Sequence, residues 1–258
     1  MESWFPAFSV FALGCCIGSF LNVCIYRLPQ DLSIVSPRSF CPQCRIPVRG
    51  YDNIPLVSYL LLGGKCRSCG AKISWRYPLV EALTGGFALA LYLKFGLTLG
   101  FFAFFAFTAT LLVITFIDLD HRIIPDVISL PGIAVGFGLS FFLPAPSWTE
   151  SLIGLLAGGG SLYLVAIGYE ALTKREGMGG GDVKLLAMIG AWLGWKAVLF
   201  TIFFASLTGT VIGGGAMLIQ KQGRHYAIPF GPFLAFAALA YLFFGPQLID
   251  WYLNLGKN

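Results

Sequence analysis

Long apolar segments separated by short polar turns dominate this sequence. Seven of them have the length of roughly 17–25 residues with which an α-helix crosses a bilayer. They lie at 4–26, 79–95, 98–117, 127–143, 150–171, 197–219 and 231–253. A shorter apolar segment, 183–194, predicts an eighth helix that is short, tilted or wrapped by its neighbours. The pattern predicts an all-α polytopic membrane protein with about eight transmembrane helices.

The composition agrees with this fold class. Hydrophobic residues make up 57% of the 258 positions and charged residues only 11%, whereas soluble domains are usually about a quarter charged. The net charge of +5 does not indicate a nucleic-acid partner, because no basic run is interleaved with aromatic residues. Basic residues instead collect in the cytoplasmic loops of membrane proteins. The expected surroundings are therefore a lipid bilayer, with no nucleic acid.

The distribution of Lys and Arg predicts the orientation. The first apolar segment has no basic residue before it and is followed by Arg27, which favours a first span with its N-terminus outside rather than a cleavable signal peptide. In that orientation fourteen of the 17 Lys and Arg residues fall in inner loops or their flanks. Asp118 and Asp182 then lie on the same, cytoplasmic side.

The largest polar region, residues 27–78, contains two CxxC motifs. Cys41 and Cys44 form the first, Cys66 and Cys69 the second, and 21 residues separate them. Two such knuckles approximate the zinc-ribbon pattern, in which four thiolates surround one structural ion. A pair of disulfides is the alternative, but a basic loop facing the reducing cytosol disfavours it. The motif predicts a small zinc-ribbon-like domain with a structural Zn²⁺.

Carboxylates mark two helix ends. Asp182 directly follows the glycines 179–181, and Asp118 continues the helical face of Leu111 and Ile114. Ionisable groups at membrane depth are expensive and indicate function. The alternatives are that Asp182 and Asp126 are helix N-caps and that Asp120 is a solvated loop charge.

Two such carboxylates suit an aspartyl protease. They cannot both ionise comfortably when close together, so one keeps a proton. The ionised carboxylate then activates water while the protonated one donates to the scissile carbonyl oxygen. Glycine beside Asp182 allows close approach of backbone or substrate.

Several longer motifs resemble those of bacterial prepilin peptidases, over nearly the whole chain. In the N-terminal half these are Gly18–Pro29, the two CxxC pairs, Asp52–Pro55, Gly64–Cys66 and Arg76–Glu81. In the C-terminal half they are Phe116–His121, Ile124–Asp126 and Gly179–Lys184.

The resemblance implies a GxGD aspartyl protease of the bacterial inner membrane, with its N-terminus periplasmic and its active site toward the cytoplasm. Such enzymes remove the leader of type IV prepilins or pseudopilins. The family's catalytic aspartates map onto Asp118 and Asp182. Gly179, Gly181, Asp120 and Asp126 are implied as supporting residues.

Many members of this family also methylate the new N-terminus with S-adenosylmethionine. The resemblance places that activity in residues 27–78, with Gly64, Lys65 and Glu81 as candidate cofactor contacts. The loop has no strand–glycine–helix fingerprint of a Rossmann cofactor site, so the methyl donor rests on the resemblance. The expected organisation is a first span at 1–26, the cysteine loop at 27–78 and a protease domain at 79–258.

Two other classes of function remain open from the residues. A proton-coupled transporter would use Asp118 and Asp182 as a relay, but it leaves the cysteine loop unexplained and no inverted repeat is evident. A secretion-system scaffold would use the zinc loop to bind a partner, but it leaves the paired aspartates unexplained.

Overall fold

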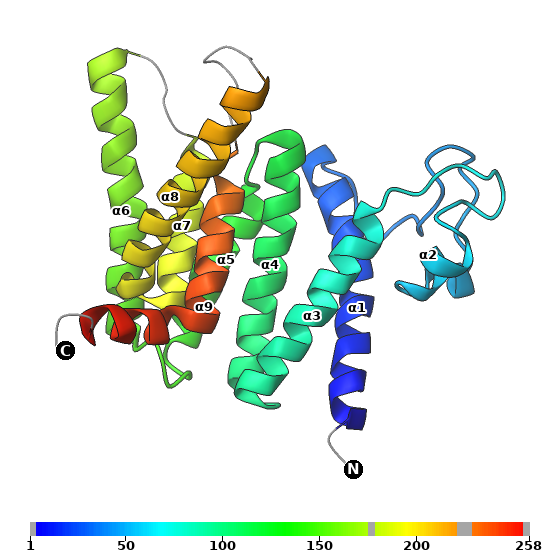
Figure 1. Cartoon of the computed structure of the whole chain (residues 1–258), viewed down its shortest axis with the longest axis horizontal. Coiled ribbons are helices and arrows are strands. Elements are labelled where there is room, and N and C mark those ends of the chain that lie inside the picture. The colour runs from blue at the N-terminus through cyan, green and yellow to red at the C-terminus, as the bar shows by residue number, and fades with distance from the viewer. Residues whose placement is uncertain (1–3, 175–178, 221–228, 255–258) are drawn as a thin grey trace. The chain divides into compact units, whose positions relative to one another are not determined.

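The computed structural model describes residues 4–174, 179–220 and 229–254, and in this part of the chain the fold is helical (Figure 1). Its helices are α1 (Trp4–Arg27), α2 (Val57–Leu61), α3 (Arg76–Phe95), α4 (Leu99–His121), α5 (Asp126–Leu139), α6 (Trp148–Thr173), α7 (Gly180–Leu193), α8 (Trp195–Gln220) and α9 (Gly231–Asn254). Short 3₁₀ helices, η1 (Leu28–Gln30) and η2 (Gly50–Asn53), lie in the loop after α1. The all-α prediction is confirmed.

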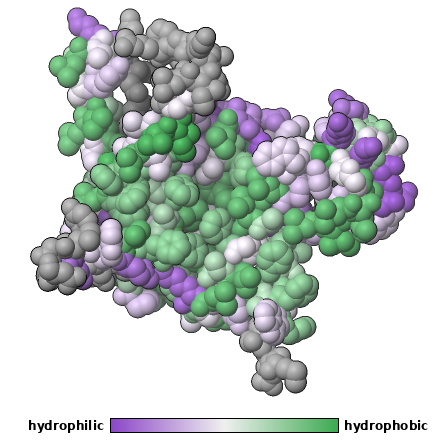
Figure 2. Space-filling model, in the orientation of Figure 1, coloured by the Kyte–Doolittle hydropathy of each residue, from purple (hydrophilic) through white to green (hydrophobic). Residues whose placement is uncertain are grey.

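Each predicted apolar segment falls on a helix, but not every helix has spanning length. Among the described residues, five helices are long and apolar enough to cross a membrane: α1, α3, α4, α6 and α8. Helices α5 and α7 have only 14 residues each. The expected number of eight spans is therefore not confirmed. Hydrophobic side chains cover much of the helical surface in Figure 2, as lipid contact requires.

The chain divides into two compact units, residues 1–113 and 114–258. In the first unit α1 packs against α3 through small residues. A Cβ on Gly14 would lie 2.9 Å from Gly85 Cα, and a Cβ on Gly18 would lie 2.7 Å from Glu81 Cα. Small residues allow helix backbones to approach this closely. The Asn22 side chain donates a hydrogen bond to Tyr77 O at 3.1 Å and fixes the register of the two helices.

In the second unit α7 is the central helix. Residues 185–193 are all buried, and α7 packs against α5, α6, α8 and α9. Ser151 on α6 donates to Ala191 O at 2.6 Å, and Trp192 donates to Gly132 O of α5 at 2.8 Å. A helix that is apolar on every side is surrounded by other elements. The expectation of a short helix wrapped by its neighbours is confirmed.

Candidate functional site

The candidate carboxylate pair lies in the second unit, at the ends of two helices. Asp118 stands three residues before the end of α4 and has only 5% of its surface exposed. Asp182 lies in the first turn of α7 and is half-buried. Gly181, next to Asp182, and Gly231, whose N–H meets Asp118, both lie against the Ile124 side chain, so the two aspartates lie in one region of the unit. The fold thus brings together two residues that are 64 positions apart in the sequence.

The backbone around Asp182 places it inside the helix. Gly179 is the N-cap of α7, with φ −69° and ψ 137°, and Asp182 N–H donates to Gly179 O at 3.1 Å. The alternative that Asp182 is itself the N-cap is therefore wrong. A Cβ on Gly181 would lie 2.9 Å from Ile124 Cβ, whereas Gly180 has open space around it. Gly181 lets the start of α7 approach the α4–α5 link, and no comparable contact explains Gly179.

Asp118 has a backbone hydrogen-bond donor that sequence reasoning missed. Its Oδ2 accepts a hydrogen bond from Gly231 N–H at 3.0 Å, in a buried position at the start of α9. A Cβ on Gly231 would lie 2.6 Å from that oxygen and 3.3 Å from Ile124 Cδ1. The glycine–proline pair at 231–232 indicates a helix start, but nothing in the sequence indicates its partner.

The other two aspartates have different surroundings. Asp126 is exposed and accepts hydrogen bonds at 2.7 Å from Lys184 Nζ on both carboxylate oxygens, an ion pair that joins α5 to α7. Pro125 is the N-cap of α5, so the alternative that Asp126 caps this helix is also wrong. Asp120 is exposed near the end of α4.

The first unit holds the four cysteines in one cluster. The sulfur atoms of Cys41, Cys44, Cys66 and Cys69 all lie within 4.8 Å of one another. Cys41 Sγ and Cys69 Sγ are 3.8 Å apart, far beyond the roughly 2.05 Å of a disulfide. A tetrahedral ion with metal–sulfur bonds of about 2.3 Å places its sulfurs about 3.8 Å apart. The cluster can hold a metal ion, and the disulfide alternative is not supported.

The two CxxC knuckles have the same backbone. Cys41 N–H donates to Ile46 O, and Cys66 N–H donates to Ala71 O. In each knuckle the acceptor lies five residues after the cysteine. Each knuckle carries one isolated antiparallel bridge, Phe40 with Pro47 and Lys65 with Lys72. The N–H groups of Cys44 and Gln43 lower the pKa of the Cys41 thiol to about 7, whereas the pKa of the Cys69 thiol in the same cluster is raised to about 11.

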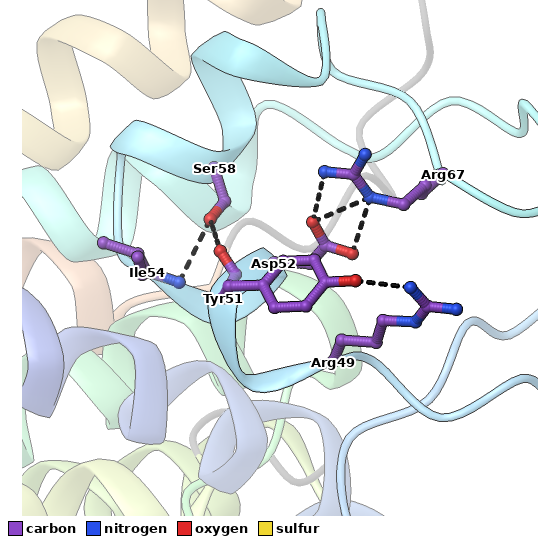
Figure 3. Close-up of polar contacts among 6 residues, drawn as sticks. All are labelled: Arg49, Tyr51, Asp52, Ile54, Ser58 and Arg67. Carbon is purple, nitrogen blue, oxygen red and sulfur yellow. Dashed lines mark hydrogen bonds and ion pairs between the residues drawn. The ribbon is translucent and has the colours of Figure 1, made fainter.

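A polar cluster ties the η2 segment to the second knuckle (Figure 3). Arg67, next to Cys66, donates to Asp52 through Nε at 2.9 Å and Nη2 at 2.7 Å, and this hydrogen bonding lowers the pKa of the Asp52 carboxyl. Arg49 donates to the Tyr51 hydroxyl, and the guanidinium groups of Arg49 and Arg67 lie 5.8 and 5.6 Å from the centre of its ring. Asp52 of the Asp52–Pro55 motif therefore links η2 to the second knuckle.

The candidate cofactor contacts are distributed over the loop and α3. Gly64 has φ +67° and packs over the Tyr59 ring, while Lys65 lies in the bridge of the second knuckle. Glu81 is 8% exposed, and its Oε2 accepts a hydrogen bond at 2.8 Å from Leu56 N–H. Leu56 has φ +61°, a conformation costly for a residue with a side chain. Glu81 thus anchors the loop to α3.

The first unit also has a pocket of about 250 Å³, bounded by one face of α1, residues 34, 35 and 37–39, and Asn53. Arg27 is buried beside it, where its guanidinium donates to Ser33 O at 2.8 Å and Pro37 O at 2.7 Å. None of Gly64, Lys65 and Glu81 lines this pocket.

Comparison with known protein families gives matches in both units. Residues 12–95 match the family model described as the bacterial peptidase A24 N-terminal domain, and residues 105–214 match that of the type IV leader peptidase family. No solved structure matches the chain significantly.

Curated relatives match along most of their length. A protein of Aeromonas hydrophila is 38% identical, over 97% of this chain and 95% of that protein. One of Pseudomonas aeruginosa is 39% identical over 94% and 91%, and one of Neisseria gonorrhoeae is 41% identical over 86% and 85%. All three are named prepilin leader peptidase/N-methyltransferase.

Proposed function

Because this chain belongs to the type IV leader peptidase family, we propose that it is a membrane aspartyl endopeptidase. Its substrates are type IV prepilins or pseudopilins, from which it removes the leader peptide, and it then methylates the new N-terminus. The observation that carries the protease half is the buried Asp118 beside the half-buried Asp182. Two neighbouring carboxylates at helix ends can act as the acid and the base of peptide hydrolysis.

The residues around the pair support its chemistry. One carboxylate takes a proton from water, whose oxygen attacks the scissile carbonyl carbon, and the other gives its proton to the carbonyl oxygen. Gly181 allows the start of α7 to pack on Ile124, which sets the position of Asp182. Asp126 supports the same helix through Lys184. We place Gly179 and Asp120 as supporting residues on the family resemblance.

For the methyltransferase half we propose residues 27–78 with S-adenosylmethionine as methyl donor, a carrier of an electrophilic methyl group. The proposal rests on the family and on the names of its relatives. Gly64 and Lys65, next to the second knuckle, remain the proposed contacts. Glu81 also remains one, although its carboxylate already accepts the Leu56 N–H.

We propose that the cysteine cluster binds one structural Zn²⁺. Four sulfurs leave no open coordination position, so such an ion stabilises the loop and does not take part in catalysis. A metal ion is a common way to stabilise a domain with little core of its own. The matching backbones of the two knuckles support this assignment.

The apolar helices and the family make this a multi-pass protein of the bacterial inner membrane. We propose that its N-terminus is periplasmic and that the aspartates face the cytoplasm, in accord with the distribution of Lys and Arg. The proposed organisation is a first span at 1–26, the methyltransferase loop at 27–78 and the protease domain at 79–258.

The carboxylate pair is tested in membranes carrying the wild-type protein, Asp118→Asn or Asp182→Asn, incubated with a prepilin and S-adenosylmethionine. Wild type should remove the leader and add one methyl, whereas each variant should lose at least about 100-fold in cleavage rate, the scale of acid–base catalysis. Asp31→Asn, the same change at an exposed loop position, is the matched control. Cleavage by either variant of the pair at the control rate would remove that residue from the site. If the wild type cleaves no pilin-like substrate, proton flux tests the transporter alternative.

A further inference from the structure

Gly231, at the start of α9, contacts Asp118 in two ways. Its N–H donates to Asp118 Oδ2 at 3.0 Å, and its missing side chain leaves the space that this carboxylate occupies. Both atoms are buried, and the contact joins residues 113 positions apart. The start of α9 is therefore built around the Asp118 carboxylate.

The two carboxylates of the pair differ in this respect. Among the described residues no hydrogen-bond donor reaches the Asp182 carboxylate, whereas Asp118 has the Gly231 N–H. A backbone N–H donated to a carboxylate favours its charged form, and hydrogen bonds to charged groups are roughly twice as strong as neutral ones. The asymmetry predicts different roles for the two residues.

The other charges near the pair do not remove this asymmetry. The elements that meet there carry Asp120, His121, Arg122, Asp126, Asp182 and Lys184, while the first four turns of α9 carry no charged side chain. Asp126 and Lys184 pair with each other. The C-terminal end of α4 opposes charge on Asp118 and the first turn of α7 favours charge on Asp182, but these dipole effects act without contact. The N–H of Gly231 touches the carboxylate.

We propose that Gly231 is a positioning residue that holds Asp118 as the ionised member of the pair, and that Asp182 carries the shared proton. This inference rests on the proposed function. Asp118 then takes a proton from water as the water oxygen bonds to the scissile carbonyl carbon, and Asp182 gives its proton to the carbonyl oxygen. In the second step Asp118 returns a proton to the leaving nitrogen as the C–N bond breaks. Asp182 regains its proton from a hydroxyl of the diol, so the pair ends as it began.

The functional test is the pH profile of prepilin cleavage by Gly231→Ala. The new Cβ displaces the carboxylate from the N–H, so the charged form of Asp118 should persist only at higher pH. The acid limb of kcat/KM should move up by about one pH unit, with a larger loss at low pH than at high pH. Gly138→Ala, the same change in open space on α5, should keep the wild-type profile. A wild-type profile for Gly231→Ala, or a loss equal at every pH, overturns the assigned role.

A second measurement does not depend on activity. Thermal unfolding of Gly231→Ala, Asp118→Ala and the double variant forms a cycle in which Asp118→Ala removes the two carboxylate atoms that the new Cβ would meet and leaves the 3.3 Å contact with Ile124 Cδ1. Gly231→Ala should lower Tm more in the wild-type background than in the Asp118→Ala background. Equal changes in Tm in both backgrounds would show that the new Cβ does not act on the Asp118 carboxylate, and would overturn the proposal. If the wild type cleaves no prepilin, the proposed function fails while this cycle still decides whether Gly231 positions Asp118.

Discussion

Replacement of Gly181 by alanine tests whether the glycine before Asp182 serves to position that residue. The added Cβ would lie 2.9 Å from Ile124 Cβ, 3.4 Å from Cγ1 and 3.6 Å from Cδ1. Carbon atoms pack at about 3.5–4.0 Å, so the nearest pair must separate by about 0.6–1.1 Å. Ile124 Cβ is attached to the backbone and cannot rotate away. The start of α7 must therefore shift.

The size of the effect follows from that shift. Overpacking of a buried contact costs about 1–3 kcal/mol, which should lower Tm without preventing folding. A displacement near 1 Å at a reacting group costs roughly 100-fold in rate. We therefore expect Gly181→Ala to lose between about 10-fold and 100-fold in kcat/KM for prepilin cleavage.

The matched control is the neighbouring residue. Gly180 has no atom within 4 Å of an added Cβ, and alanine is the better helix former by about 0.8–1.0 kcal/mol. Gly180→Ala should cleave at close to the wild-type rate and unfold no earlier. If the two variants lose activity equally, or if Gly181→Ala stays within about twofold of Gly180→Ala, contact with Ile124 does not explain the glycine.

Three further predictions concern the first unit. Purified protein should contain about one zinc per chain. Cys69→Ser should lose the zinc, whereas Cys16→Ser, outside the cluster, should keep it. A wild-type protein without zinc would contradict the proposed zinc site. Lys65→Ala should reduce methylation more than cleavage in a mass assay of the pilin N-terminus. Glu81→Gln keeps an acceptor for Leu56 N–H, whereas Glu81→Ala leaves this donor unpaired at a cost of about 1–3 kcal/mol. If Glu81 only anchors the loop, the Gln variant should methylate like wild type and the Ala variant should not; equal loss in both indicates a direct role.

The features that sequence predicts well are those encoded over short distances. The helices follow from runs of apolar residues, and the cysteine cluster follows from two spaced CxxC motifs. Asp118 lies on the same buried face as Leu111 and Ile114, as helical spacing indicates. The number of spans was less predictable, because α5 ends at Leu139 and is only 14 residues long.

Contacts between distant residues could not be predicted in this way. Asp126 follows a proline at a helix start, where a capping role is the natural expectation, but its carboxylate binds Lys184, 58 positions away. Gly231 is separated from Asp118 by 113 positions. Ile124 meets the positions of both Gly181 and Gly231, and no local pattern distinguishes it from other apolar residues. A single sequence carries no signal for such pairs.

The position of the two aspartates along their helices bears on the choice between protease and transporter. Asp118 lies three residues from the end of α4, and Asp182 is the third residue of α7. At 1.5 Å per residue, each carboxylate is within about 5 Å of a helix end. Transporter sites lie near the bilayer midplane, at breaks within helices, whereas these helices are unbroken at the two aspartates. Because α4 has spanning length, the end of α4 that carries Asp118 is expected near a membrane face, where water and an extended substrate segment can reach it. Its position therefore favours hydrolysis at the membrane face over proton transfer across the membrane.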